Sequence, residues 1–227
     1  MRKILVILGW LAVSVSSFAA GLETLSNGDA VSGLKDALTQ GASAAIGKLG
    51  VENGFLGNAQ VKIPLPDALK RIEGGLRLMG MQRQADELVT AMNRAAEQAV
   101  PEAKSLLTSA VRNMSVQDAK GILSGGETAA TDYFKRATSA QLTKTFLPIV
   151  TKATSKVGLA EKYNGLAGQA AQYGLINAEQ AKIENYVTQK TLDGLFLMIA
   201  EQEKAIRKDP IGTATGMAQK VFGLLRR

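Results

Sequence analysis

The chain has 227 residues, of which 46% are hydrophobic and only 5% aromatic, and its formal net charge is +7. This length allows one domain with a substantial core, and the hydrophobic content excludes a disordered chain. The absence of Cys and His excludes disulfides, zinc sites built on nitrogen or sulfur, and Ser-His-Asp or Cys-His catalysis. We therefore predict no metal site and no cofactor.

The N-terminus has the pattern of a secretory signal peptide. Arg2 and Lys3 precede an apolar run over residues 4–15, and Ser17 and Ala19 are the small residues of a cleavage site. We predict a signal peptide over residues 1–19, cleaved after Ala19, and a periplasmic location. The alternative is an uncleaved membrane anchor, for which the apolar run is short. No cysteine follows, so the protein is not predicted to be a lipoprotein.

Helical periodicity organises the mature chain. Residues 20–30 are predicted to be a flexible N-terminal segment, and residues 31–227 a single all-helical domain, because no strand alternation of useful length occurs. The first helix should end near Leu49, with Gly50 in the left-handed position that follows a helix. Residues 51–66 contain Pro64 and Pro66, which impose an extended backbone, so this segment is predicted to be an ordered connector.

Residues that cap or interrupt helices divide the middle of the chain into several predicted helices. Pro101 should end or kink a long helix that begins near Gln82. Ser115 and Asp118 have the spacing of a capping box at the start of a short helix. Ser139 is predicted to cap a new helix, separate from one over residues 128–138. A weaker helix, Glu161 to Tyr173, and a final helix from Pro210 complete the pattern.

One helix is predicted to lie at the centre of the fold, at about residues 183–208. Its middle, Leu195 to Ala200, is apolar on all sides, which is typical of a helix buried among others. Asn177 with Gln180 forms a second capping box, predicted to open this helix. The fold class is therefore all-α: a compact multi-helix bundle around a central buried helix, with an extended Pro-containing connector near residues 51–66.

The flank of the central helix contains the first candidate ligand-binding residues, Tyr186, Lys190 and Asp193. Polar groups on a buried helix need partners, because an unpaired buried charge costs several kcal/mol. One interpretation is an internal Lys190–Asp193 pair, with the Tyr186 hydroxyl bonded to a loop. The other is a pocket in which Lys190 faces an anionic ligand.

Asn93 and Arg94, on the long helix after the connector, are the remaining candidate ligand-binding residues. Arg94 and Glu97 are three residues apart and could pair on the helix surface. Alternatively, Arg94 reaches Asp193, or a bound carboxylate or phosphate, which its planar guanidinium suits.

No catalytic residue is predicted. Asp86-Glu87 and Glu201 with Glu203 are carboxylate pairs that diverge on a helix, so neither forms a general acid/base pair. Without histidine, a hydrolase would need carboxylates from separate helices. The chain offers no nucleic-acid recognition motif.

Four segments together resemble one protein family: KIPLP at 62–66, ADELVTAMNRAAEQAVPEAK at 85–104, TDYF at 131–134 and YVTQKTLDGLF at 186–196. They are similar to the bacterial proteins grouped as the domain of unknown function 4197 family, over roughly residues 31 to 223. The resemblance implies an all-helical protein exported in Gram-negative bacteria. It implies no activity, ligand or catalytic residue.

These observations predict a non-enzymatic periplasmic binding or interaction module, with an unknown envelope protein or a small apolar or amphipathic ligand as its partner. The alternatives are an envelope enzyme that uses carboxylates with Lys or Tyr, and a structural partner of another envelope protein. No nucleic-acid partner is predicted. The C-terminal helix has an apolar stripe and terminal basic residues, so weak contact with a membrane surface is a further prediction.

Overall fold

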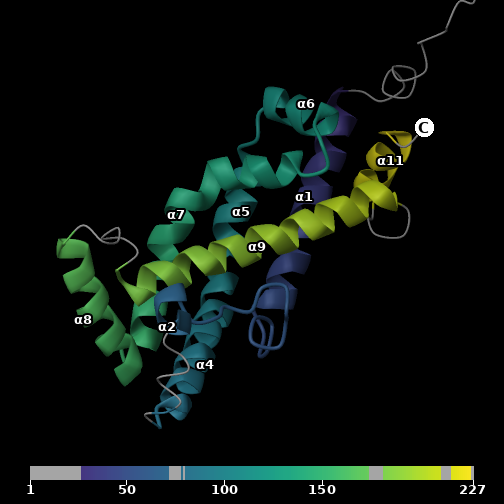
Figure 1. Ribbon diagram of the computed structural model, residues 1–227. Helices are drawn as coiled ribbons and strands as arrows, with labels where there is room; N and C mark the ends of the chain where they lie inside the picture. Colours follow the sequence, from purple (N-terminus) through teal and green to yellow (C-terminus); the bar gives the residue numbers. More distant parts are fainter. Residues whose placement is uncertain (1–26, 72–77, 79, 174–180, 211–215, 226–227) are drawn as a thin grey trace, which may run out of the picture.

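A long central helix, α9, crosses the other helices of the computed structural model (Figure 1). The structure describes residues 27–71, 78, 80–173, 181–210 and 216–225, so the predicted signal peptide lies outside it. Within these residues every regular element is helical, and the all-α prediction is confirmed. The elements are α1 (Asn27–Leu49), α2 (Asp67–Arg71), α4 (Gln82–Ala99), the 3-10 helix η1 (Val100–Glu102), α5 (Ala103–Arg112), α6 (Val116–Ser124), α7 (Ala129–Thr154), α8 (Gly158–Gln172), α9 (Ile183–Lys208) and α11 (Gly216–Leu225).

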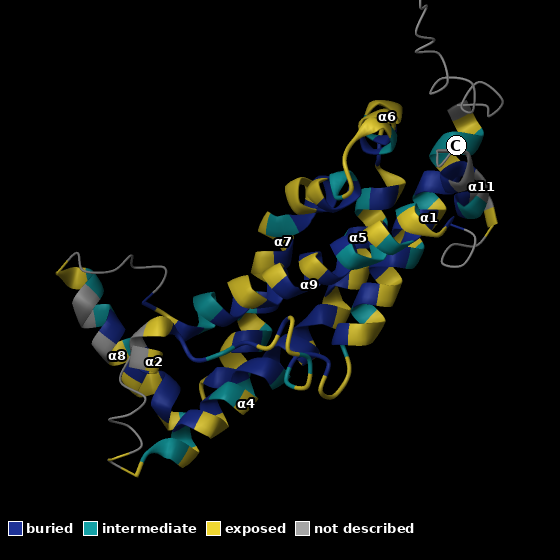
Figure 2. Ribbon diagram, turned by 45° about the vertical axis from the view of Figure 1, so that its right-hand side comes forward, coloured by how far each residue is buried: buried dark blue, intermediate teal, exposed yellow. Residues whose placement is uncertain are grey.

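Helix α9 is the centre of the bundle, as the sequence predicts. It packs against α7, α1 and α4, and the side chains of Leu195 and Ile199 are buried. Within its apolar middle only Leu197 is exposed, at 40%, because it lies on the same side as the charged residues of the helix. Figure 2 shows this alternation of buried and exposed bands along α9. The helix is therefore buried on most of its circumference and retains one solvent-facing row.

The connector between α1 and α2 is not helical, as predicted for residues 51–66: turns occupy most of residues 51–61, and the Pro-containing residues 62–66 follow without turn or helix. It contains turns but no helix, and the side chains of Phe55, Val61 and Ile63 enter the core. Phe55 lies against α9 at Gly194, where a Cβ atom would come within 2.7 Å of the Phe55 ring. Glycine at this position therefore gives the connector its close approach to the central helix.

Helix α7 differs from the prediction that Ser139 caps a separate helix. Residues 129–154 form one continuous helix, and Ser139 lies inside it. The Thr138 hydroxyl donates to the Phe134 carbonyl, so the hydroxyl group bonds within the helix instead of ending it. The buried row of Phe134, Thr138 and Leu142 continues across the predicted break.

The first helix ends at Leu49 as predicted, but its start and the conformation of Gly50 differ from the prediction. It begins at Asn27, so residues 27–30 of the segment predicted to be flexible are helical. Gly50 does not have a positive φ angle, which is found instead at Asn53, with φ 67°. Gly50 is required for a different reason, because a Cβ atom there would lie 2.9 Å from Pro101.

Two predicted helix boundaries, at Ser115 and at Pro101, are confirmed. The Ser115 hydroxyl accepts from the Asp118 amide, and the Asp118 carboxylate accepts from the Ser115 amide, both at 3.1 Å. Pro101 lies in η1, which separates α4 from α5.

The start of α9 agrees with the predicted bound near residue 183, and the predicted capping box is not among the described residues. Asn177 and Gln180 lie outside the described residues, and α9 begins at Ile183. The Ile183 amide donates to the side-chain oxygen of Asn164, at 2.8 Å. A residue of α8 therefore supplies the acceptor that a local cap usually provides.

Helix α11 packs against α1 and buries Ala218, Val221 and Phe222. This part of its apolar stripe faces the bundle. Among the described residues, no helix is long and apolar enough to cross a membrane.

The close approach at Gly194 is testable by substitution with alanine. We expect Gly194→Ala to lower the free energy of unfolding by about 1–2 kcal/mol, because the buried Phe55 ring must shift to accommodate the methyl group. Gly47→Ala is the matched control, since Gly47 lies exposed inside α1 with nothing within 4 Å of the added Cβ atom. The control should stabilise the protein by about 0.5–1 kcal/mol in urea denaturation. Equal effects of the two variants would contradict the close approach.

Candidate functional site

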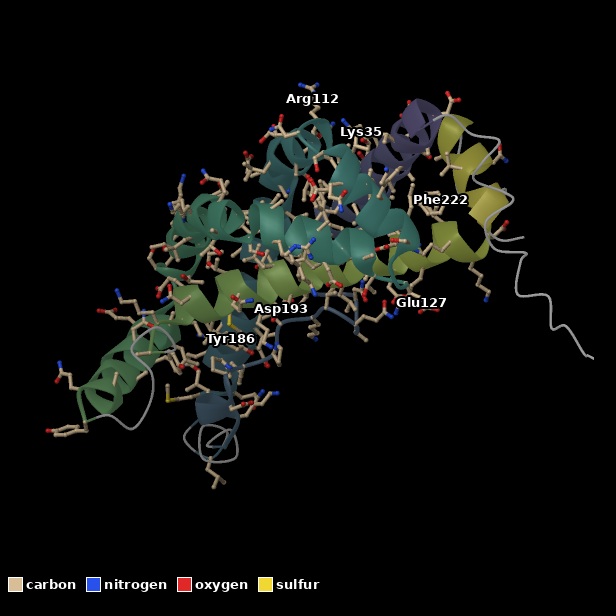
Figure 3. The ribbon with its side chains drawn as sticks, turned by 90° about the horizontal axis from the view of Figure 1, so that it is seen from above. Lys35, Arg112, Glu127, Tyr186, Asp193 and Phe222 are labelled. Carbon is tan, nitrogen blue, oxygen red and sulfur yellow. The ribbon has the colours of Figure 1, made fainter. Side chains whose placement is uncertain are left out.

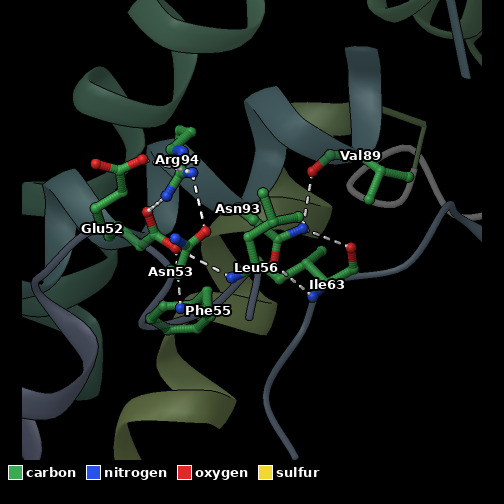
Figure 4. A network of polar contacts seen from close by, with 9 residues as sticks. Glu52, Asn53, Phe55, Leu56, Ile63, Val89, Asn93 and Arg94 are labelled. Atoms are coloured by element: carbon green, nitrogen blue, oxygen red, sulfur yellow. Dashed lines mark hydrogen bonds and ion pairs between the residues drawn. The ribbon is translucent and has the colours of Figure 1, made fainter. Parts of the chain in front are cut away.

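Asn93, a predicted ligand-binding residue, is fully buried and bonded to the chain itself (Figure 4). Its side-chain oxygen accepts from the Ile63 amide at 2.8 Å, and its amide group donates to the Ile63 carbonyl at 2.9 Å. A further bond runs to the Val89 carbonyl, at 2.8 Å. Asn93 therefore pairs with the connector backbone as a neighbouring strand would, and it has no hydrogen-bonding capacity directed at an open cavity.

Arg94 pairs with Glu97, and this pair also binds the connector. One Glu97 carboxylate oxygen accepts from the consecutive amides of Phe55 and Leu56, both at 3.0 Å. The other oxygen bonds to the Arg94 guanidinium at 2.5 Å. The second nitrogen of the guanidinium donates to the side-chain oxygen of Asn53 at 3.0 Å and contacts Glu52 at 3.2 Å.

These contacts favour the surface pair of Arg94 with Glu97 over its contact with Asp193. It forms the i, i+3 pair with Glu97 rather than reaching Asp193, because Asn53 and Glu52 occupy its other nitrogen. The bond to Asn53 holds that residue in its positive-φ conformation, at the turn that begins the connector.

The Glu97 carboxylate is held in its charged form by the same contacts. Burial raises its pKa, but the hydrogen bonds from the Leu56 amide, the Arg94 side chain and the Phe55 amide together lower the pKa below its ordinary value of 4.5. The carboxylate is therefore ionised at neutral pH.

Tyr186 contacts the connector from the opposite side, from α9. Its hydroxyl donates to the Pro64 carbonyl at 3.1 Å. Burial, with smaller contributions from Asp67 and Tyr163, raises the pKa of Tyr186 to about 12, so the hydroxyl remains protonated and able to donate. We call Asn93, Arg94, Glu97 and Tyr186 the connector clamp.

Lys190 and Asp193 lie on the exposed row of α9, outside the connector clamp. Their side chains are 45% and 53% exposed, and the Lys190 ammonium lies 3.8 Å from the Asp193 carboxylate. The premise that these charges are buried and need internal partners is therefore wrong. Figure 3 shows Tyr186 and Asp193 along the same helix, and the Lys190 ammonium lies 6.0 Å from the centre of the Tyr186 ring.

A second buried carboxylate, Glu203 on α9, has contacts of the same kind. It accepts from the consecutive amides of Ala130 and Thr131, at 3.0 and 2.9 Å, and from the Thr131 hydroxyl. Arg207, one turn later, donates to Glu203 at 2.9 Å and to the Ile122 carbonyl at 3.0 Å. Glu203 therefore binds the N-terminus of α7, where the helix dipole favours a negative charge.

Sequence reasoning treated Glu203 only as part of a divergent carboxylate pair. Glu203 lies four residues before Arg207 in the central helix, and this spacing is the sequence feature that indicates a paired carboxylate. The backbone amides that it binds lie more than 70 residues away, and no local pattern reveals them.

A cavity of about 20 Å³ lies between α1, α7, α9 and α11, with apolar walls and the Glu203 carboxylate. One water needs about 10–15 Å³, so this space is far too small for a lipid or other amphipathic ligand. Among the described residues, no three acidic side chains are grouped closely enough to hold a metal ion. Asp86 is exposed on α4, and Glu201 pairs with Lys204 on α9.

A family model described as "Protein of unknown function (DUF4197)" matches residues 24–223. The chain belongs to this family. No curated protein and no solved structure matches the chain. The match includes all four segments from which the resemblance is drawn. Three of these segments meet at the connector. KIPLP supplies Ile63 and Pro64, the α4 segment supplies Asn93 and Glu97, and the α9 segment supplies Tyr186. The remaining segment, TDYF, begins with the residue that Glu203 binds.

The buried carboxylate of the connector clamp is testable by truncation. We expect Glu97→Ala to lower the free energy of unfolding by about 2–3 kcal/mol, because the buried Phe55 amide, the partly buried Leu56 amide and Arg94 lose their acceptor. Glu87→Ala is the matched control on the same helix, because Glu87 forms only an exposed pair with Arg83. That control should cost less than about 0.5 kcal/mol in urea denaturation. Similar losses in both variants would show that Glu97 does not hold the connector.

The lowered pKa of Glu97 has a consequence for acid stability. A carboxyl group whose pKa is lower in the folded state stabilises the protein fully above its unfolded pKa, and this contribution is lost as the pH falls through the folded pKa. The stability difference between the wild type and Glu97→Gln should therefore shrink between about pH 7 and about pH 3. Glu87→Gln provides the control difference. A Glu97 difference that grows on acidification would contradict the lowered pKa.

Proposed function

We propose that this protein is an exported, non-enzymatic interaction module of the bacterial envelope, which binds a partner protein through the surface where the connector meets α9. We call this surface the platform and define it by the connector residues Lys62, which is exposed, and Pro64, which is half-buried, with the α9 residues Tyr186, Lys190, Asp193 and Leu197. The N-terminal pattern of residues 1–19 supports export.

The convergence of three family segments at the connector is the observation that supports this proposal best. An extended segment of this kind has high conformational entropy when free, and ordering each residue costs about 1–2 kcal/mol. The side chains of Asn93, Glu97 and Tyr186 offset that cost by bonding its backbone groups. A surface that is fixed before binding loses less entropy when a partner docks.

The exposed side chains of the platform suit a protein partner. Lys190 and Asp193 supply one charge of each sign, and Leu197 supplies an exposed apolar side chain one turn further along α9. Opposite charges beside an apolar contact give a partner orientation as well as affinity.

The experiment places a photo-crosslinking residue at Leu197 in the native host. Position 197 lies four residues from Asp193, in the tested charge pair, and four residues from Glu201, in the control pair. We expect a discrete adduct with one envelope protein. Exchanging the charges by Lys190→Asp with Asp193→Lys should reduce the adduct by about tenfold, since like charges would then face each other across the interface.

The neighbouring pair provides the control for that exchange. Lys204 is 45% exposed, like Lys190, and pairs with Glu201 at the same i, i+3 spacing. The exchange Glu201→Lys with Lys204→Glu should leave the adduct within about twofold of the wild type. No adduct at position 197, or equal loss from both exchanges, would contradict the platform.

A further inference from the structure

Helix α8 lies at the left-hand end of the bundle in Figure 1 and packs against α4 and α9. One face of α8 recurs every four residues, and Leu159, Tyr163 and Ala167 on this face are buried. Asn164, next to Tyr163, is half-buried, and its side chain bonds to the start of α9. The position of α8 is therefore linked to the helix that carries most of the platform.

The Asn164 side chain binds the first turn of α9 through its oxygen and through its amino group. The oxygen accepts from the Ile183 amide at 2.8 Å, and the amino group donates to both oxygens of the Glu184 carboxylate, each at 3.1 Å. A carboxylate accepts hydrogen bonds and does not donate, so Glu184 fixes the orientation of the Asn164 side chain, with the oxygen toward Ile183. Glu184 is itself well placed, because the N-terminus of a helix favours a negative charge.

Asn164 replaces a local cap of α9. The first amides of a helix have no acceptor within it, and Lys182, at the N-cap position, forms no cap bond with its side chain. Asn164 supplies the acceptor for the Ile183 amide from a different helix. The turn closes at Tyr186, whose backbone amide donates to the Lys182 carbonyl at 3.3 Å. The turn that carries Tyr186 is therefore stabilised from α8.

The same turn holds the Tyr186 side chain against the connector. Its hydroxyl donates to the Pro64 carbonyl at 3.1 Å, and both residues belong to the platform. Tyr163 of α8 lies close enough to Tyr186 to contribute, after burial and Asp67, to the raised pKa of its hydroxyl. If the first turn of α9 opened, Tyr186 would lose its position beside Pro64.

We propose that Asn164 is a positioning residue of the platform, through which the docking of α8 is coupled to the binding of the partner protein. The role toward a partner rests on the proposed function, but the coupling within the protein is measurable without one. With α8 docked, the first turn of α9 is capped and Tyr186 is fixed before a partner binds, which lowers the entropy lost on binding. A partner that binds the fixed platform stabilises the docking of α8 by the same free energy.

Two rates test the coupling in the full protein without a partner. The first is hydrogen exchange of the Ile183 amide, and the second is nitration of Tyr186 by tetranitromethane, followed by peptide mass spectrometry. Asn164→Ala should raise both rates about fivefold, the effect of losing a helix cap. Lys162→Ala is the matched control, because Lys162 is exposed on the same turn of α8. It should change both rates by less than about twofold.

An exchange of donor and acceptor separates the Asn164 contact from a general loss of stability. Asn164→Asp should also raise both rates, because the new carboxylate faces that of Glu184. Adding Glu184→Gln supplies an amide that donates to the new carboxylate, which still accepts from the Ile183 amide. The double variant should return both rates to within about twofold of the wild type.

The photo-crosslinked adduct at position 197 tests whether the coupling reaches the partner. Asn164→Ala should reduce the adduct about fivefold, and the double variant should restore it. Unchanged rates in Asn164→Ala, equal effects of Lys162→Ala, or no recovery in the double variant would overturn the coupling. Faster rates with an undiminished adduct would overturn the positioning role. A wild type that forms no adduct would contradict the proposed function, and the two rates would still decide whether Asn164 positions Tyr186.

Discussion

The extended connector can lie inside a helical protein only because side chains provide the hydrogen-bond partners that its backbone lacks. Three of its amides, at Phe55, Leu56 and Ile63, donate to side chains of α4, and the Pro64 carbonyl accepts from Tyr186 of α9. An unpaired buried amide costs about 1–3 kcal/mol, so the loss of these partners would expel the segment from the core. Phe55 would leave with it, and the close packing against Gly194 depends on Phe55.

A buried glutamate that binds backbone amides of a distant segment occurs twice in the bundle. Glu97 and Glu203 are buried glutamates that each accept from two consecutive backbone amides and from an arginine nearby on the same helix. Glu97 fixes the connector to α4, and Glu203 fixes the start of α7 to α9. A buried charge is costly unless its oxygens are fully bonded, and both carboxylates meet that condition. Their role is to join segments that are distant in sequence.

Sequence periodicity predicted the fold class and the central helix, but it did not predict the polar contacts. The apolar circumference of residues 195–200 predicted the central helix, and Pro64 and Pro66 predicted the extended connector, because both features are local. The pairing of Asn93 with Ile63 spans 30 residues, and no spacing rule foresees it. Lys190 and Asp193 seemed to need buried partners because the helix around them is apolar. Helical periodicity does not show which side of a helix the neighbouring helices leave uncovered. Ser139 was predicted to cap a helix because serine is common at that position. The residue type alone does not distinguish a capping serine from a serine inside a helix.

Hydrogen exchange of the Phe55, Leu56 and Ile63 amides tests the central claim most directly, because their acceptors are the side chains of Glu97 and Asn93. If the connector clamp fixes the segment, these amides should exchange as slowly as the amides of the α9 core, through global unfolding. Exchange at the rate of an open loop, while α9 stays protected, would show that the connector is not held by those side chains.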